Sequence, residues 1–300
     1  RAFLCGVDRH SGKSYEHRRG WIEDRVRILA SLFSIRLCAY AVMSNHYHLV
    51  VKLCPGESRS WSDEEVLARW TSLFKGPLLV QHYQAGESLS DPEQETLCDL
   101  VSVYRRRLAS LSWFMKCLNE PIARRANAED RCTGHFWEAR FHSQSLRSER
   151  ALLTAMAYVD LNPIRAKLAR TPEQSQFTSL KARLEGDRQR ALRAVVSRLL
   201  DRHELRHFEV PVRPLMPFAE PTRPTIGEHP AHVLPIGAYE YLKLVDATGR
   251  IVRTSKRGRI DPSLASLLER LGLTPEQWIE ASTQFRGIYR NGDLKLMQTA

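Results

Sequence analysis

The histidines of the segment His46-Tyr47-His48 are spaced to bind one metal ion. They lie within residues 37–53, where two runs of apolar and β-branched residues flank a turn pair of serine and asparagine. This pattern predicts two strands joined by a tight turn. Side chains alternate between the faces of a strand, so His46 and His48 project from one face and Tyr47 from the other. Two adjacent imidazoles on a rigid strand can hold one divalent metal ion.

The alternative is that the two histidines are ordinary polar residues on the solvent-exposed face of a hairpin. The flanking residues are apolar, with Ala41-Val42 before the pair and Leu49-Val50-Val51 after it. A solvent-exposed face would carry polar residues at positions 42 and 50 as well. Histidines in an apolar strand need a polar partner, because burying an unpaired polar group is costly. We therefore favour a metal site.

A second chemical element lies in the segment 157–166. Ser148 is placed to begin a helix that runs to Leu161, where a proline closes it. Tyr158 and Asn162 are four residues apart and share one helical face. If this helix packs across the histidine strand, the Tyr158 hydroxyl and the Asn162 amide oxygen would both reach a metal-bound phosphate. A helical tyrosine alone is more often a core residue, and it is the combination with the histidine pair that favours chemistry.

The charge of the chain favours a polyanionic partner. The formal net charge is +11 and the isoelectric point is about 9.6, which favours nucleic acid over a membrane surface because no basic amphipathic anchor stands out. The alternative is a generally basic protein whose arginines lie on solvated faces. The candidate phosphate-binding residues are Arg105, Arg106, Arg107, Arg124, Arg125, Arg140, Arg165, Lys256, Arg257 and Arg259.

Composition predicts the compartment. No apolar run approaches the ~20 residues needed to cross a bilayer, and no secretory signal pattern is present. The six cysteines show no C-x-x-C spacing, so reduced thiols are the simplest account. We expect a cytoplasmic, nucleoid-associated protein.

The order of predicted elements indicates an α+β fold with an antiparallel sheet. We expect strands at residues 2–7 and 134–142, a helix at 21–33 and another at 101–119, besides the elements already described. Residues 57–99 hold three Lys/Arg against nine Asp/Glu, which predicts an inserted, acidic pair of helices that does not contact DNA. The expected units are a catalytic domain at 1–170 with an insertion at about 55–100, a helical extension at 171–208, a proline-rich linker at 209–236 and a small domain at 237–300.

The sequence of the expected small C-terminal domain is compatible with two structures. Short strand-like runs at 241–245 and 251–252 precede a basic loop, and helices are expected at 263–271 and from Thr274 onward. Two helices joined by a glycine turn beside a basic loop resemble a helix-turn-helix. A plain helical hairpin is at least as compatible with the pattern.

Taken together, the motifs resemble a known family. His46-Tyr47-His48 is similar to the His-hydrophobic-His signature of HUH endonucleases. The segment Tyr-Val-Asp-Leu-Asn-Pro-Ile-Arg-Ala that begins at Tyr158 is similar to the single-tyrosine transposases, in the branch of REP-associated tyrosine transposases. The segments 41–46 and 136–141 also match that branch. The resemblance covers roughly residues 1–170.

The resemblance implies a ferredoxin-like sheet with the histidines on a central strand and the tyrosine on a helix. It implies a transposase that binds single-stranded or hairpin DNA from palindromic repeats and cleaves it with Tyr158, through a 5′-phosphotyrosine. His46, His48 and Asn162 would hold the metal, for which Mn²⁺ suits the mixed nitrogen and oxygen ligands and Mg²⁺ would keep several waters. The alternatives are a catalytically silent protein that binds and masks repeat hairpins, and a metal hydrolase that activates water. The choice between monomer and homodimer stays open.

Overall fold

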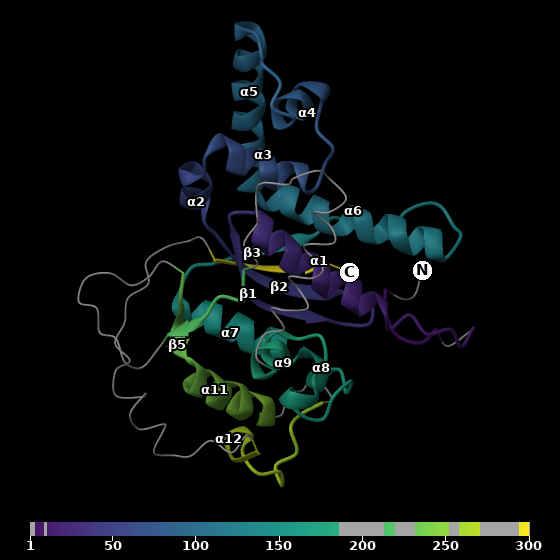
Figure 1. Ribbon diagram of the computed structural model, residues 1–300. Helices are drawn as coiled ribbons and strands as arrows, with labels where there is room; N and C mark the ends of the chain where they lie inside the picture. The colour runs from purple at the N-terminus through teal and green to yellow at the C-terminus, as the bar shows by residue number, and fades with distance from the viewer. Residues whose placement is uncertain are drawn as a thin grey trace, which may run out of the picture.

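A four-stranded antiparallel sheet divides the structure into two helical layers (Figure 1). The computed structural model describes residues 4–8, 11–185, 213–219, 232–251, 258–270 and 294–299. The strands lie in the order β1-β2-β6-β3, formed by Ile35–Val42, Tyr47–Leu53, Leu294–Thr299 and His142–Leu146 respectively. One hydrophobic core fills each side of the sheet. The predicted α+β class is confirmed.

The β1–β2 hairpin forms as predicted. Val42 pairs with Tyr47 and Ala41 with His48, and Met43 N–H donates to His46 O at 2.8 Å to close the turn. An irregularity in the register between Leu37 and Ala39 marks a β-bulge. A bulge changes the face to which later side chains point.

The first layer consists of three long helices. Helix α1 spans Arg18–Leu32, α5 spans Asp91–Leu108 and α6 spans Leu111–Glu129. The single helix expected over 101–119 is wrong, because the chain breaks at Ser110. The Ser110 side chain accepts a hydrogen bond from Trp113 N–H, so it satisfies an otherwise unpaired donor and starts a new helix.

The acidic insertion is helical, but it holds three short helices and the start of α5 where a pair was predicted. Helices α2 (Pro55–Ser60), α3 (Asp63–Thr71) and α4 (Leu78–Gln84) precede α5. Ser62 caps α3 by accepting from Glu65 N–H at 3.2 Å. In Figure 1 helix α4 and the first turns of α5 project away from the sheet.

The second layer holds the predicted tyrosine helix. Its long members are α7 (Glu149–Asp160) and α11 (Ala238–Arg250). Short elements complete this side of the molecule: α8 (Asn162–Arg165), the 3-10 turn η1 (Pro172–Gln174), α9 (Ser179–Leu184), β4 (Phe218–Ala219), β5 (Leu234–Gly237) and α12 (Leu267–Arg270). In Figure 1 helix α7 lies between the sheet and α11.

Several predicted strands are wrong. Residues 241–245 belong to helix α11, whose buried residues Tyr241, Leu242, Val245 and Gly249 follow helical spacing. Strand β3 begins only at His142, after an irregular segment. Residues 4–8 contain no extended strand and make only an isolated bridge, between Val7 and Ser14.

The C-terminal part of the chain shares the sheet and the second core with the N-terminal part. Strand β6 pairs with β2 and β3, and helix α11 packs in the same core as α7. The helix expected from Thr274 onward, with most of the expected helical extension, lies outside the described residues. Within the described ranges, every helix is too short or too polar to cross a membrane.

Ser148 makes a testable contribution to α7. Its side chain accepts from Ala151 N–H at 3.1 Å, so Ser148→Ala should lower the free energy of unfolding by about 1 kcal/mol. The control is Thr154→Ala on the exposed face of the same helix, which should be neutral or slightly stabilising because alanine favours helices. Urea denaturation measures both, and equal effects of the two substitutions would contradict the capping role.

Candidate functional site

The two histidine rings of β2 lie with their Nε2 atoms facing each other. The distance between His46 Nε2 and His48 Nε2 is 3.2 Å. Two nitrogens that each lie about 2.1 Å from one metal ion are separated by roughly 3.0–3.4 Å when the ligand angle is about 90–110°. His48 is buried and His46 is partly exposed. The pair therefore has the spacing of two ligands of one ion, with access from the His46 side.

Asn45 orients the more exposed ring. Its Oδ1 atom lies 2.7 Å from His46 Nδ1, and because a carbonyl oxygen can only accept, His46 Nδ1 carries the proton. The Nε2 lone pair is then directed at His48, so the 3.2 Å contact is a hydrogen bond donated by His48 Nε2–H. His46 has the tautomer that a metal ligand needs, whereas His48 would have to lose its Nε2 proton when a metal binds. Sequence reasoning missed this role of Asn45, although an amide next to the histidine was a signal for it.

Arg19 holds the turn on which Asn45 and His46 lie. Its guanidinium donates to Val42 O at 2.8 Å and to Ser44 Oγ at 3.2 Å. Glu16 pairs with the same guanidinium at 2.7 Å. This anchor comes from α1 and was not predicted, because the sequence does not indicate which arginine faces the turn.

Tyr47 points to the opposite face, as the alternation predicted. Its hydroxyl donates to Asn119 Oδ1 on α6, and its ring packs edge-on against Trp137 at 5.8 Å between centroids. Trp137 Nε1 donates to Asn119 O at 2.9 Å. Tyr47 therefore fixes β2 against the first layer and leaves the two histidines facing the second.

Tyr158 lies against His48. The centroids of the two rings are 5.5 Å apart and the ring planes are inclined by 76°. Tyr158 is partly exposed, whereas its neighbours Ala157 and Val159 are buried. Helix α7 thus brings a phenol to the histidine pair, the juxtaposition on which the predicted chemistry depends.

Asn162 follows one turn later, as the first residue of α8. Its side chain is 4 % exposed, and its Nδ2 atom has no hydrogen-bond partner among the described residues. A buried amide donor without a partner is costly. The free Nδ2 can donate to an anionic oxygen such as that of a phosphate, whereas a metal ion would be held by the Oδ1 atom. Asp160 points away from the pair, into the core beside α9 and α11.

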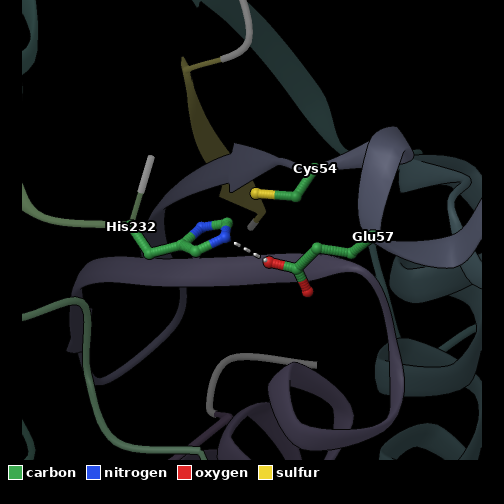
Figure 2. Close-up of side chains that lie close together, drawn as sticks. All are labelled: Cys54, Glu57 and His232. Atoms are coloured by element: carbon green, nitrogen blue, oxygen red, sulfur yellow. Dashed lines mark ion pairs between the residues drawn. The ribbon is translucent and has the colours of Figure 1, made fainter. Parts of the chain in front are cut away.

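A second group of possible metal ligands lies at the far end of β2. Cys54 Sγ, a Glu57 carboxylate oxygen and a His232 ring nitrogen all lie within 4.8 Å of one another (Figure 2). Sequence reasoning missed this group because Cys54 and Glu57, three residues apart, do not form a metal motif by themselves and His232 comes from a distant part of the chain.

The surroundings of this second group already carry an excess of positive charge. Glu57 pairs with Arg36 at 2.8 Å, with Arg213 at 2.9 Å and with His232 at 3.3 Å. Burial raises the pKa of the Cys54 thiol to about 11, and a metal ion binds the thiolate. A divalent ion here would also meet two guanidinium groups at close range. The histidine pair beside Tyr158 is the better candidate metal centre.

Two of the predicted phosphate-binding arginines are engaged inside the protein. Arg105 donates to Ser58 O at 2.7 Å and to Asp63 at 2.5 Å. Arg165 is buried and donates to Thr248 O at 2.6 Å. A phosphate contact by either residue would require these bonds to break.

The other arginines of that set lie nearer the surface. Arg107 and Arg125 stack on Trp113 and Trp21 with 4.3 and 3.8 Å to the ring centroids. Arg124 is exposed and pairs with Glu120. Three further members are exposed: Arg106, Arg140 and Arg259. Lys256 and Arg257 lie outside the described residues.

The comparisons with known proteins give no match to a family model, a curated protein or a solved structure. The site is thus defined by its own geometry. The structure brings His46, His48 and Tyr158 together in direct contact, with Asn162 on the following helical turn.

The two groups of possible ligands can be separated by metal titration. His48→Ala should weaken Mn²⁺ binding by more than about tenfold, since loss of even an outer-shell partner costs 10–100-fold. The control Cys54→Ser, at the second group, should bind Mn²⁺ as the wild type does. Isothermal titration of the three proteins measures this, and the reverse result would place the metal at Cys54, Glu57 and His232.

Proposed function

We propose that this protein is a metal-dependent endonuclease and strand transferase acting on single-stranded DNA, with Tyr158 as the nucleophile. In this proposal it cleaves and rejoins DNA at hairpins of palindromic repeats, in DNA transposition. The observation that carries the proposal is the contact of the Tyr158 ring with His48, whose Nε2 lies 3.2 Å from that of His46. The resemblance of both motifs to HUH single-tyrosine transposases supports it.

The reaction is a transesterification. The Tyr158 hydroxyl oxygen attacks the phosphorus of a phosphodiester, and the bond between phosphorus and the 3′ oxygen breaks. The phenol proton passes to solvent, and the leaving 3′ oxygen takes up a proton to become a free 3′-OH. The DNA 5′ end is then joined to Tyr158 as a phosphotyrosine. A 3′-OH can later reverse the step and release Tyr158, so no ATP is needed.

The side chains around Tyr158 have separate roles in this scheme. His46, His48 and Asn162 would hold Mg²⁺ or Mn²⁺, which when bound would withdraw charge from the phosphate and offset the weak nucleophilicity of a phenol at neutral pH. Asn45 keeps the His46 lone pair directed into the site. The edge of His48 limits the orientations of the Tyr158 ring.

The charge distribution supports a nucleic-acid substrate. The chain carries a net charge of +11, and Arg106, Arg140 and Arg259 are exposed. A polyanion gains most of its affinity from such contacts. The carboxylates of Glu87, Asp91, Glu93 and Glu95 lie in the loop after α4 and in the first turns of α5. This part of the chain projects away from the sheet (Figure 1), which leaves the basic remainder of the chain to face DNA.

A covalent adduct tests the role of Tyr158. A hairpin-bearing oligonucleotide labelled 3′ of the cleavage site should form a denaturation-resistant adduct with the wild type in Mg²⁺ or Mn²⁺. Tyr158→Phe should form none, because the ring remains and the attacking oxygen is lost. Gel electrophoresis of denatured samples measures the adduct, and folding is checked by thermal unfolding.

The same assay separates the alternatives. Equal adduct in both proteins would remove Tyr158 from the mechanism. Cleavage without adduct that survives Tyr158→Phe would indicate a metal hydrolase. Tight hairpin binding with no cleavage in any metal would indicate a silent hairpin-binding protein.

DNA affinity should depend on salt. For single strands the logarithm of the binding constant should fall with the logarithm of the salt concentration with a slope of about −0.7 per neutralised phosphate. Arg140→Gln should reduce that slope if Arg140 contacts a phosphate, whereas Arg124→Gln, which removes a residue paired with Glu120, should change it less. Fluorescence anisotropy at several salt concentrations measures both, and a salt-independent affinity would rule out an electrostatic interface.

A further inference from the structure

We propose that the C-terminal clamp, defined as helix α11 (Ala238–Arg250) with residues 258–260, positions Tyr158 and Asn162 for the reaction. This inference rests on the proposed function. Figure 1 shows α11 along α7, on the side away from the sheet. Under this proposal, residues of the C-terminal region are required for the correct position of the catalytic tyrosine.

The first contact of the clamp is with Asp160, two residues after Tyr158. The Asp160 carboxylate is buried and accepts from Tyr241 on α11 at 2.5 Å, from Ser179 Oγ at 2.6 Å and from Leu180 N–H at 3.0 Å. Burial raises the pKa of the carboxyl, and these hydrogen bonds oppose the rise. Three donors from two other helices therefore fix the rotation of α7 about its axis.

The second contact is with Arg165, three residues after Asn162. Its guanidinium donates to Thr248 O at 2.6 Å and to Ile251 O at 2.8 Å, at the C-terminal end of α11, and to Gly258 O at 3.2 Å. Carbonyls at a helix C-terminus attract a cation. Arg165 thus ties the end of α8 to the clamp by three backbone acceptors.

The third contact is the close approach of two glycines to the segment 161–164. A Cβ atom at Gly258 would lie 1.8 Å from Ile164 O, so only glycine permits this approach. At Gly249 a Cβ would lie 3.0 Å from Leu161 Cδ2. The clamp therefore touches the chain on either side of Asn162, and a larger residue at position 258 must displace α8.

These contacts lie on the opposite side of the motif from the histidines. At about 100° per residue, Asp160 points some 200° away from Tyr158 around the helix. Tyr158 contacts His48 while Asp160 contacts Tyr241. The same short motif therefore presents a reactive side to β2 and an anchored side to the clamp, and a shift of the anchor moves the phenol.

The test uses Gly258→Ala in the full-length chain. A displacement of about 1 Å in a reacting group can cost about 10²-fold in rate, so the rate of adduct formation should fall by at least tenfold, with the affinity for the oligonucleotide within about twofold of wild type. Amide hydrogen exchange should rise in residues 157–165 and stay unchanged in β1. The matched control is Gly20→Ala, where a Cβ has open space, and it should change none of these quantities.

Two further variants separate positioning from stability. Tyr241→Phe removes only the hydroxyl that binds Asp160. It should lower the rate of adduct formation and raise amide exchange in residues 157–165, both by less than Gly258→Ala does. This variant tests the clamp even if Gly258→Ala fails to fold. Leu29→Ala, in the other core, should lower the thermal stability. At temperatures at which this variant is still folded, its rate of adduct formation should equal that of the wild type. Unchanged exchange and rate in Tyr241→Phe would overturn the clamp. An absence of adduct in the wild type would overturn the proposed function instead, while exchange would still report on the clamp.

Discussion

Helix α7 packs across strands β1 and β2, and the geometry of the whole site depends on that packing. The strand residues Cys38, Ala39, Ala41 and Val50 form the sheet side of the contact. Most of these side chains are small, so the helix approaches closely and the Tyr158 ring reaches the edge of His48. The β-bulge after Leu37 contributes, because it turns both Cys38 and Ala39 toward the second core.

The site places polar groups at the boundary of an apolar core, and the protein compensates for their burial locally. Asp160 has three donors, and Arg165 has three carbonyl acceptors. The Nδ2 atom of the buried Asn162 amide has no partner among the described residues, a property it shares with Thr171 Oγ1 and Arg183 Nε. Under the proposed function, the free amide hydrogens of Asn162 would donate to a phosphate oxygen of the substrate.

Local patterns predicted the parts of the site that depend on local geometry. The alternation of strand side chains placed His46 and His48 on one face and Tyr47 on the other, and the four-residue spacing placed Tyr158 and Asn162 on successive turns. The capping serine at 148 marked the start of α7. Each of these features depends only on the geometry of a single strand or helix, so residue spacing in the sequence is enough to predict it.

Features that depend on distant contacts could not be predicted. Taken alone, the segment around Tyr241 has the composition of a strand. It forms a helix because the apolar residues spaced along one helical face pack against α7 in the second core. Arg165 looked like a phosphate ligand until its carbonyl partners were placed beside it. The pairing of β6 with β2 and the meeting of Cys54 with His232 both join residues far apart in the chain.

The projecting acidic helices give the molecule two electrically unlike ends. Residues 57–99 carry nine Asp/Glu against three Lys/Arg, although the whole chain is strongly positive. Such a separation of charge is a permanent dipole moment, and the field of a polyanion exerts a torque on it. Under the proposed function, the protein would therefore rotate as it diffuses toward DNA, with the acidic start of α5 trailing, and arrive with an orientation already selected before any side chain makes contact.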